Sequence, residues 1–252
     1  MARSIYIASP NAGTGKSTVA LGLVSCLTKV VAKVGVFRPF VEDRKGDAFL
    51  SLLLNRAGST TPAEQCVGAT WDEFHADPEE ALARIVDAYR AMAREHDVVI
   101  IDGSDFTDVA GNPELALNAR VAANIGVPVL LVVSGQSDVE DVVASVEVSM
   151  AEIADNHART VAVVANKCLP ETRQAVGEAL TAIEGITSTT LPEVPLLAAP
   201  VVREVLDAVE GTLIAGDETL LDREAESVLV CAMDVSHVLE RLTAGQLAIV
   251  PA

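Results

Sequence analysis

The stretch Ser9-Pro10-Asn11-Ala12-Gly13-Thr14-Gly15-Lys16-Ser17-Thr18 follows a short apolar run and precedes apolar residues at helical spacing. This order predicts a strand, a glycine-containing turn and a helix that leaves from Gly15. Backbone N–H groups in such a turn converge on one point, and the helix N-terminus adds partial positive charge. The stretch therefore predicts a phosphate-binding loop.

Two side chains of this loop have specific expected roles. Lys16 is placed to reach the outer phosphates of a nucleotide, and the Ser17 hydroxyl to ligate the accompanying Mg²⁺. Pro10 stands where the full pattern has glycine, and Gly13 partly compensates by letting the backbone approach the phosphates. The alternative is a glycine turn before a buried helix, with a surface lysine. The candidate nucleotide-contacting residues of the loop are Asn11, Gly13, Thr14, Gly15, Lys16, Ser17 and Thr18.

Composition and charge narrow the class of protein. Half of the 252 residues are apolar and only 3% are aromatic, which suits a parallel sheet packed under helices. The formal charge is 18 − 36 = −18, and such a surface disfavours nucleic acid and anionic membranes as partners. The cysteines form no CxxC pair, the histidines have no partner at ligand spacing, and no apolar run approaches membrane-spanning length. We expect a cytoplasmic protein with reduced thiols and no signal peptide.

Short apolar runs alternate with helical patterns along the first 186 residues. This alternation predicts a three-layer α/β domain with a parallel sheet and helices on both faces. Helix-start signals stand at Asp77-Pro78-Glu79-Glu80, Asn112-Pro113-Glu114, Ser137-Asp138-Val139-Glu140 and Pro170-Glu171. The predicted strands are Ile5–Ala8, Val34–Phe37, Val98–Ile101, Val127–Val133 and Val161–Ala165.

The pattern changes after Ile186. Thr187–Thr190 and the prolines that follow predict an extended connection, which leads to a short helix at Val202–Val209. Beyond Gly211 we predict a strand, a helix and a strand, at Val228–Cys231, Val235–Leu242 and Leu247–Val250. We expect two domains, 1–210 and 211–252, the second a truncated piece because it ends in a strand with too small a core.

Carboxylates follow two predicted strands. Asp102 ends the run Val98–Ile101, and Asp47 opens a helix after the second strand. Ligands of open α/β sheets sit at the carboxyl ends of strands, so Ser17, Asp47 and Asp102 predict an oxygen-rich Mg²⁺ site. Asp102 would otherwise cap a turn, and Asp47 would otherwise cap its helix.

Arg38 and Asn166 end two further predicted strands. Arg38 would face phosphate or an anionic substrate, or else pair with a neighbouring acid. The Asn166 amide offers a donor and an acceptor, which suits a purine edge, although asparagine is also a common turn residue at strand ends.

Taken together, these motifs resemble the dethiobiotin-synthetase-like branch of P-loop proteins over residues 3–210. The matching positions are Gly15-Lys16-Ser17, Arg38-Pro39, Gly46-Asp47-Ala48, Asp102-Gly103 and Asn166-Lys167. Within that branch the sequence is most similar to the N-terminal region of long bacterial phosphate acetyltransferases. The stretches that favour this are Val34–Pro39, Leu191–Pro195, Leu220–Glu224 and Cys231–Met233, the last two resembling the opening of a DRTGG domain.

The resemblance implies a regulatory or assembly region of an enzyme that converts acetyl-CoA and phosphate into acetyl phosphate and CoA. The acetyltransferase domain and its acyl-transfer residues would lie outside this chain. ATP or another nucleotide with Mg²⁺, a small-molecule effector and a homo-oligomer are implied in the same way.

Three other functions compete with this one. A free-standing ATP- and Mg²⁺-dependent ligase of the dethiobiotin synthetase type is the main alternative, but Arg38 stands where that enzyme has lysine, and the exchange is not conservative. A ParA/MinD-like ATPase would carry a signature lysine where Asn11 stands. In the third, Pro10 would mark a decayed site that binds little nucleotide.

Overall fold

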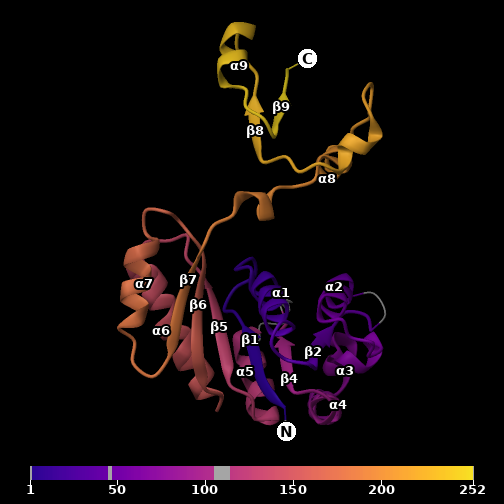
Figure 1. Ribbon diagram of the computed structural model, residues 1–252, viewed down its shortest axis with the longest axis vertical. Helices are drawn as coiled ribbons and strands as arrows, with labels where there is room; N and C mark the ends of the chain where they lie inside the picture. The colour runs from indigo at the N-terminus through magenta and orange to yellow at the C-terminus, as the bar shows by residue number, and fades with distance from the viewer. Residues whose placement is uncertain (1, 45–46, 105–113, 252) are drawn as a thin grey trace. The chain divides into compact units, whose positions relative to one another are not determined.

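The computed structural model describes residues 2–44, 47–104 and 114–251 (Figure 1). Contacts divide the chain into two compact units, Met1–Glu193 and Val194–Ala252, which we call unit 1 and unit 2. Gly46 and the predicted helix start at Asn112-Pro113 lie outside the described residues.

Unit 1 is built on a parallel sheet of seven strands in the order β3-β2-β4-β1-β5-β6-β7 (Figure 1). The strand β1 lies at the centre, between β4 and β5, and its last three residues, Tyr6, Ile7 and Ala8, are buried in the core. The phosphate-loop stretch therefore leaves the middle of the sheet at its carboxyl edge. The strands are β1 Arg3–Ala8, β2 Val34–Val41, β3 Val67–Thr70, β4 Val98–Asp102, β5 Val129–Ser134, β6 Thr160–Cys168 and β7 Thr187–Pro192.

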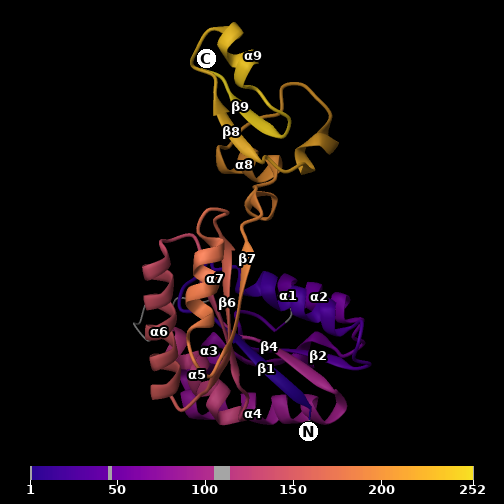
Figure 2. The same ribbon diagram turned by 60° about the vertical axis from the view of Figure 1, so that its left-hand side comes forward.

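Helices cover both faces of this sheet, which confirms the predicted three-layer α/β architecture (Figure 2). The helices α1 and α2 pack together on one face, whereas α4, α5, α6 and α7 form a row on the other. The helices of unit 1 are α1 Lys16–Leu27, α2 Ala48–Ala57, the 3₁₀ turn η1 Ala63–Cys66, α3 Trp71–Ala76, α4 Pro78–Glu95, α5 Glu114–Ile125, α6 Val139–Asp155 and α7 Arg173–Thr181.

Local signals in the sequence set several helix ends. Asp77 caps α4, because its Oδ1 accepts hydrogen bonds from the N–H groups of Glu79 and Glu80 at 3.1 and 3.0 Å, and Pro78 takes the first helical position. The helix α5 ends at Ile125, and Gly126 follows it with a φ of 68°, the left-handed conformation that commonly terminates helices.

The predicted end of the second strand was wrong. Arg38 does not end β2, which runs on to Val41. β4 pairs with β2 only as far as Phe37, and β3 pairs with it from Arg38 onward. Pro39 has no N–H group to donate, and it lies where the β4 ladder has already stopped.

The stretch Thr187–Thr190, predicted as a connection, is instead part of the edge strand β7. It pairs in parallel with β6, and Cys168 at the end of β6 also accepts a hydrogen bond from the N–H of Glu193 at 3.0 Å. Alternate residues of β7 are exposed, so the stretch lacks the apolar run by which the buried strands were recognised.

Unit 2 contains a small β–α–β arrangement. Its strands β8 and β9 pair in parallel with each other, and α9 lies between them in sequence, as the pattern after Gly211 predicted. The boundary at 210/211 stays a prediction. The elements of unit 2 are η2 Pro195–Ala198, α8 Val202–Ala208, η3 Glu218–Asp222, β8 Ser227–Val230, α9 Val235–Arg241 and β9 Gln246–Ile249.

Across the described ranges of both units, none of the helices combines the length and the apolar character needed to span a membrane.

Candidate nucleotide site

The loop between β1 and α1 is a tight turn that ends in a left-handed residue. The Ser9 hydroxyl donates a hydrogen bond to the Asn11 carbonyl oxygen at 2.9 Å, and Gly15 caps α1 with a φ of 80°. Glycine supplies no side chain to the first N–H groups of the helix. Those donors and the helix dipole therefore suit an external anion.

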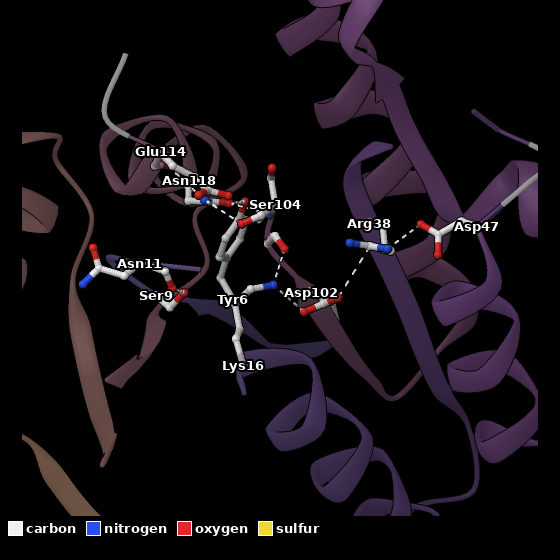
Figure 3. Close-up of polar contacts among 11 residues, drawn as sticks. Tyr6, Ser9, Asn11, Lys16, Arg38, Asp47, Asp102, Ser104, Glu114 and Asn118 are labelled. Atoms are coloured by element: carbon white, nitrogen blue, oxygen red, sulfur yellow. Dashed lines mark hydrogen bonds and ion pairs between the residues drawn. The ribbon is translucent and has the colours of Figure 1, made fainter. Parts of the chain in front are cut away.

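Lys16, the first residue of α1, is buried beneath the loop. Its Nζ donates to Asp102 Oδ1 at 2.8 Å and also to the Gly103 carbonyl oxygen (Figure 3). The side chains of Lys16 and Asp102 are 1% and 0% exposed. This placement excludes the alternative of a surface lysine and joins α1 to the end of β4, which lies beside β1.

Arg38 links the two predicted metal-ligating acids. One of its terminal nitrogens contacts Asp47 Oδ2, and its Nε lies 3.5 Å from Asp102 Oδ2 (Figure 3). The alternative of pairing with a neighbouring acid is therefore what the structure contains. Lys16, Arg38, Asp47 and Asp102 form one chain of contacts, which we call the charge cluster.

Asp47 also caps α2. Its Oδ1 accepts a hydrogen bond from the Leu50 N–H at 2.7 Å, as the helix-cap interpretation predicted. This contact uses one carboxylate oxygen and leaves the other for Arg38. A cap role and a role in the charge cluster are therefore compatible.

One oxygen of the charge cluster is poorly satisfied. Asp102 Oδ2 and Arg38 Nε are both buried, and neither has a hydrogen-bond partner within the described part of the chain. A buried carboxylate oxygen without a donor is unfavourable, and it suits a metal-bound water or a cation. With the Ser17 hydroxyl on the first turn of α1, the residues present fit a phosphate ligand accompanied by Mg²⁺.

The end of β6 holds the loop from the opposite side. Asn166 Nδ2 donates to the Thr14 carbonyl oxygen at 2.8 Å, and Lys167 Nζ donates to the Gly13 carbonyl oxygen at 2.7 Å. Lys167 has a φ of 59°, which turns its side chain back at a break in the β6–β7 register. The sequence did not assign a role to Lys167, because its backbone conformation has no signal in the residue pattern.

We expect Asn166→Ala to lower the free energy of unfolding by about 1 kcal/mol, because the Thr14 carbonyl oxygen loses its donor. Urea denaturation followed by circular dichroism would measure this. Lys167→Met is the matched comparison. It removes a more exposed donor, which bonds the Gly13 carbonyl oxygen, and should lower the free energy of unfolding by less. Equal stability of wild type and Asn166→Ala would contradict the role of Asn166 in holding the loop.

A buried hydrogen-bond network supports the site behind β4. Asn118 Oδ1, on α5, accepts from the Tyr6 hydroxyl at 2.7 Å and from the Ser104 N–H at 3.0 Å (Figure 3). Burial, helped by the nearby carboxylates of Asp102 and Glu114, raises the pKa of Tyr6 well above its usual value. Tyr6 is therefore a neutral donor that fixes the chain just after Asp102.

The structure brings most of the candidate residues to one edge of the sheet. Thr14 is buried, and Gly15 and Ser17 are partly exposed. Asn11 and Gly13 are exposed on the loop, and Thr18 is exposed on the first turn of α1. Their roles in binding nucleotide stay predictions, as does the reading of a base by Asn166, whose Nδ2 is engaged with the loop.

Two protein families match the chain. Residues 3–206 match the AAA domain family (AAA_26), and residues 204–252 match the DRTGG domain family. The first match covers nearly all of unit 1 and also the first residues of unit 2, as far as α8.

Curated relatives match over nearly the whole chain. The chain is 25% identical to the phosphate acetyltransferase of Nitratidesulfovibrio vulgaris over 100% of its length, and 25% identical to that of Synechocystis over 96%. It spans only 38% and 36% of those two proteins. It is also 28% identical to hydrogenobyrinate a,c-diamide synthase of Streptomyces coelicolor, over 78% of the chain and 37% of that protein.

Solved structures share the fold at low sequence identity. A putative plasmid partition protein of Borrelia burgdorferi, bound to AMPPNP, has a TM-score of 0.55 at 14% identity, covering 87% of the chain and 94% of that protein. Chloroplast FtsY of Physcomitrella patens has a TM-score of 0.53 at 19% identity, covering 77% and 59%. Unit 1 has a P-loop NTPase-like fold, which confirms the fold class expected from the sequence.

Proposed function

Since this chain belongs to the AAA domain family and continues into a DRTGG domain, we propose that it is the nucleotide-binding regulatory or assembly region of a phosphate acetyltransferase. The parent enzyme would convert acetyl-CoA and phosphate into acetyl phosphate and CoA. Similarity to enzymes of that name along the chain's full length supports this proposal. The acetyl-transfer domain would be a separate part of the parent protein, and the assembled enzyme a homo-oligomer in the cytoplasm.

Nucleotide binding is the part of the proposal that rests on geometry. The observation that carries it is the hydrogen bond that Lys16 Nζ donates to Asp102 Oδ1 at 2.8 Å. This bond lies below the loop that ends in the left-handed residue Gly15. The loop N–H groups would hold the phosphates of ATP or another nucleotide, with Lys16 moving toward them. Ser17, Asp47 and Asp102 would hold Mg²⁺, which neutralises phosphate charge when bound. The binding energy would bias the orientation of the acetyl-transfer domain. The coupling free energy between two such sites is typically about 1–3 kcal/mol.

Calorimetric titration of ATP with Mg²⁺ into the chain and into Lys16→Met tests this proposal. We expect measurable binding to the wild type and at least a tenfold weaker affinity in the variant, since the ammonium that would bond the phosphates is lost. Lys29→Met, at an exposed position beyond the end of α1, is the matched control and should bind as the wild type does.

The same preparation should form no acetyl phosphate from acetyl-CoA and phosphate. Turnover by the chain alone would contradict the regulatory assignment. Negligible ATP affinity in the wild type and the variant alike would contradict nucleotide binding and indicate a decayed site.

A ligase of the dethiobiotin synthetase type is the second candidate. The 28% identity to a diamide synthase, another enzyme named for a synthetic reaction, favours it. Such a ligase would hydrolyse ATP only when diaminopelargonate and carbon dioxide are present. The Arg38 contacts with Asp47 and Asp102 weigh against it, because the cation at this position is engaged within the protein.

A further inference from the structure

Arg38 lies between the two carboxylates that would serve a divalent cation. Its guanidinium reaches Asp47 Oδ2 at one end and Asp102 Oδ2 at the other (Figure 3). Its side chain is 14% exposed, close to the 13% of Asp47, so solvent reaches this side of the charge cluster. The planar, permanently charged guanidinium thus supplies the positive charge that balances these two carboxylates.

The two ends of Arg38 are held unequally. At the Asp47 end the guanidinium makes a hydrogen bond. At the Asp102 end the 3.5 Å contact is an ion pair without a hydrogen bond, and both facing atoms are buried. Lys16, by contrast, bonds the other oxygen of Asp102 at 2.8 Å. The Asp102 Oδ2 contact is therefore the weak link of the charge cluster, and a better ligand for that oxygen would displace Arg38 from it.

The charges of the cluster also indicate that a metal ion would displace Arg38. Lys16 and Arg38 contribute two positive charges, and Asp47 and Asp102 contribute two negative charges, so the cluster is neutral as it stands. A divalent cation that entered beside Arg38 would be repelled by it at short range in a poorly solvated place. The cation gains full attraction from both acids only when the guanidinium has moved out.

We propose that Arg38 is a built-in competitor of the divalent cation, a specificity-determining residue that keeps the metal-free site neutral and must swing out before a metal ion binds. This inference rests on the proposed function, since it concerns the same site. It adds that Arg38, which is not itself a metal ligand, lowers the affinity of the site for a metal ion in the absence of nucleotide.

Binding of Mn²⁺ alone, without nucleotide, tests the proposal. Free Mn²⁺ would be measured by electron paramagnetic resonance in titrations of wild type, Arg38→Gln and Arg44→Gln. We expect Arg38→Gln to bind Mn²⁺ about tenfold more tightly than the wild type, because a nearby positive charge has gone. Arg44→Gln removes the same charge from an arginine bonded to Glu73 and Gly68, and it should leave the affinity within twofold.

A further substitution tests whether the gain in Mn²⁺ affinity arises at the charge cluster. Asp47→Asn keeps a good helix cap but removes one acid of the cluster, so Arg38→Gln with Asp47→Asn should lose most of the gain. Equal affinities for Arg38→Gln and Arg44→Gln, or a gain that survives Asp47→Asn, would overturn the proposal. If Arg38→Gln does not fold, Arg38→Lys replaces it, since a single ammonium cannot span both carboxylates. A gain of about threefold is then expected, and an unchanged affinity would overturn the proposal.

This test is independent of nucleotide binding. A wild-type chain that binds no ATP, together with an Arg38→Gln variant that gains Mn²⁺ affinity, would remove the proposed function and keep the inference. ATP binding to the wild type, with no gain in the variant, would do the reverse.

Discussion

Replacing Asp102 by alanine is expected to lower the free energy of unfolding by about 3–5 kcal/mol. The substitution leaves the Lys16 ammonium, whose side chain is 1% exposed, without its carboxylate in the interior. It also removes the partner of Arg38 Nε. Urea denaturation, followed by circular dichroism, would measure the loss.

Two comparisons separate this effect from the general cost of truncation. Asp47→Ala removes an acid of the same charge cluster that is 13% exposed and caps α2, and it should cost about 1 kcal/mol. Lys16→Met combined with Asp102→Ala removes both buried charges and should be more stable than Asp102→Ala alone. A loss below about 1 kcal/mol for Asp102→Ala would mean that Lys16 finds another partner or reaches solvent.

Gly15→Ala is expected to be the most damaging small substitution in the loop. Gly13 and Gly15 have φ values of 75° and 80°, so alanine is strained at both, by about 1 kcal/mol. A Cβ at Gly13 meets nothing within 4 Å, whereas a Cβ at Gly15 would lie 2.3 Å from Asn166 Nδ2. The amide would have to leave the Thr14 carbonyl oxygen, which brings the expected loss at Gly15 to about 3 kcal/mol.

Thermal and urea unfolding of Gly13→Ala and Gly15→Ala would measure the difference, with Gly13→Ala as the matched control. In an Asn166→Ala background, the clash is absent and the two alanine variants should lose similar stability. Equal losses in the wild-type background would mean that the loop shifts away from β6 at little cost.

The sequence predicted those parts of unit 1 that depend on local patterns. Short apolar runs identified β1 and β4, and cap residues such as Asp77 marked a helix start. The two edge strands, β3 and β7, were missed because β3 has only four residues and β7 has no apolar run. The end of β2 was misplaced because its last residues depend on pairing with β3. These errors concern strands and strand ends that are defined by pairing between separate segments, to which local patterns do not respond.

The candidate site divides in the same way. Residue type and order were enough to nominate Lys16 and Asp102, because the loop motif and the acid at a strand end are local features. The sequence left open whether Arg38 pairs with an acid, since either partner requires the folded sheet. Asn166 was nominated for a purine edge, although its amide bonds the loop, and this contact spans 152 positions of sequence.

The two hydrogen bonds at the end of β6 have a mechanical consequence. Lys167 fastens the loop at Gly13, and its neighbour Cys168 fastens Glu193, the last residue of unit 1. One strand end thus serves as a common anchor for the phosphate loop and for the point where the chain leaves the first unit. We therefore expect a displacement of the loop at Gly13 to shift the chain at Glu193, because the two contacts are made by adjacent residues.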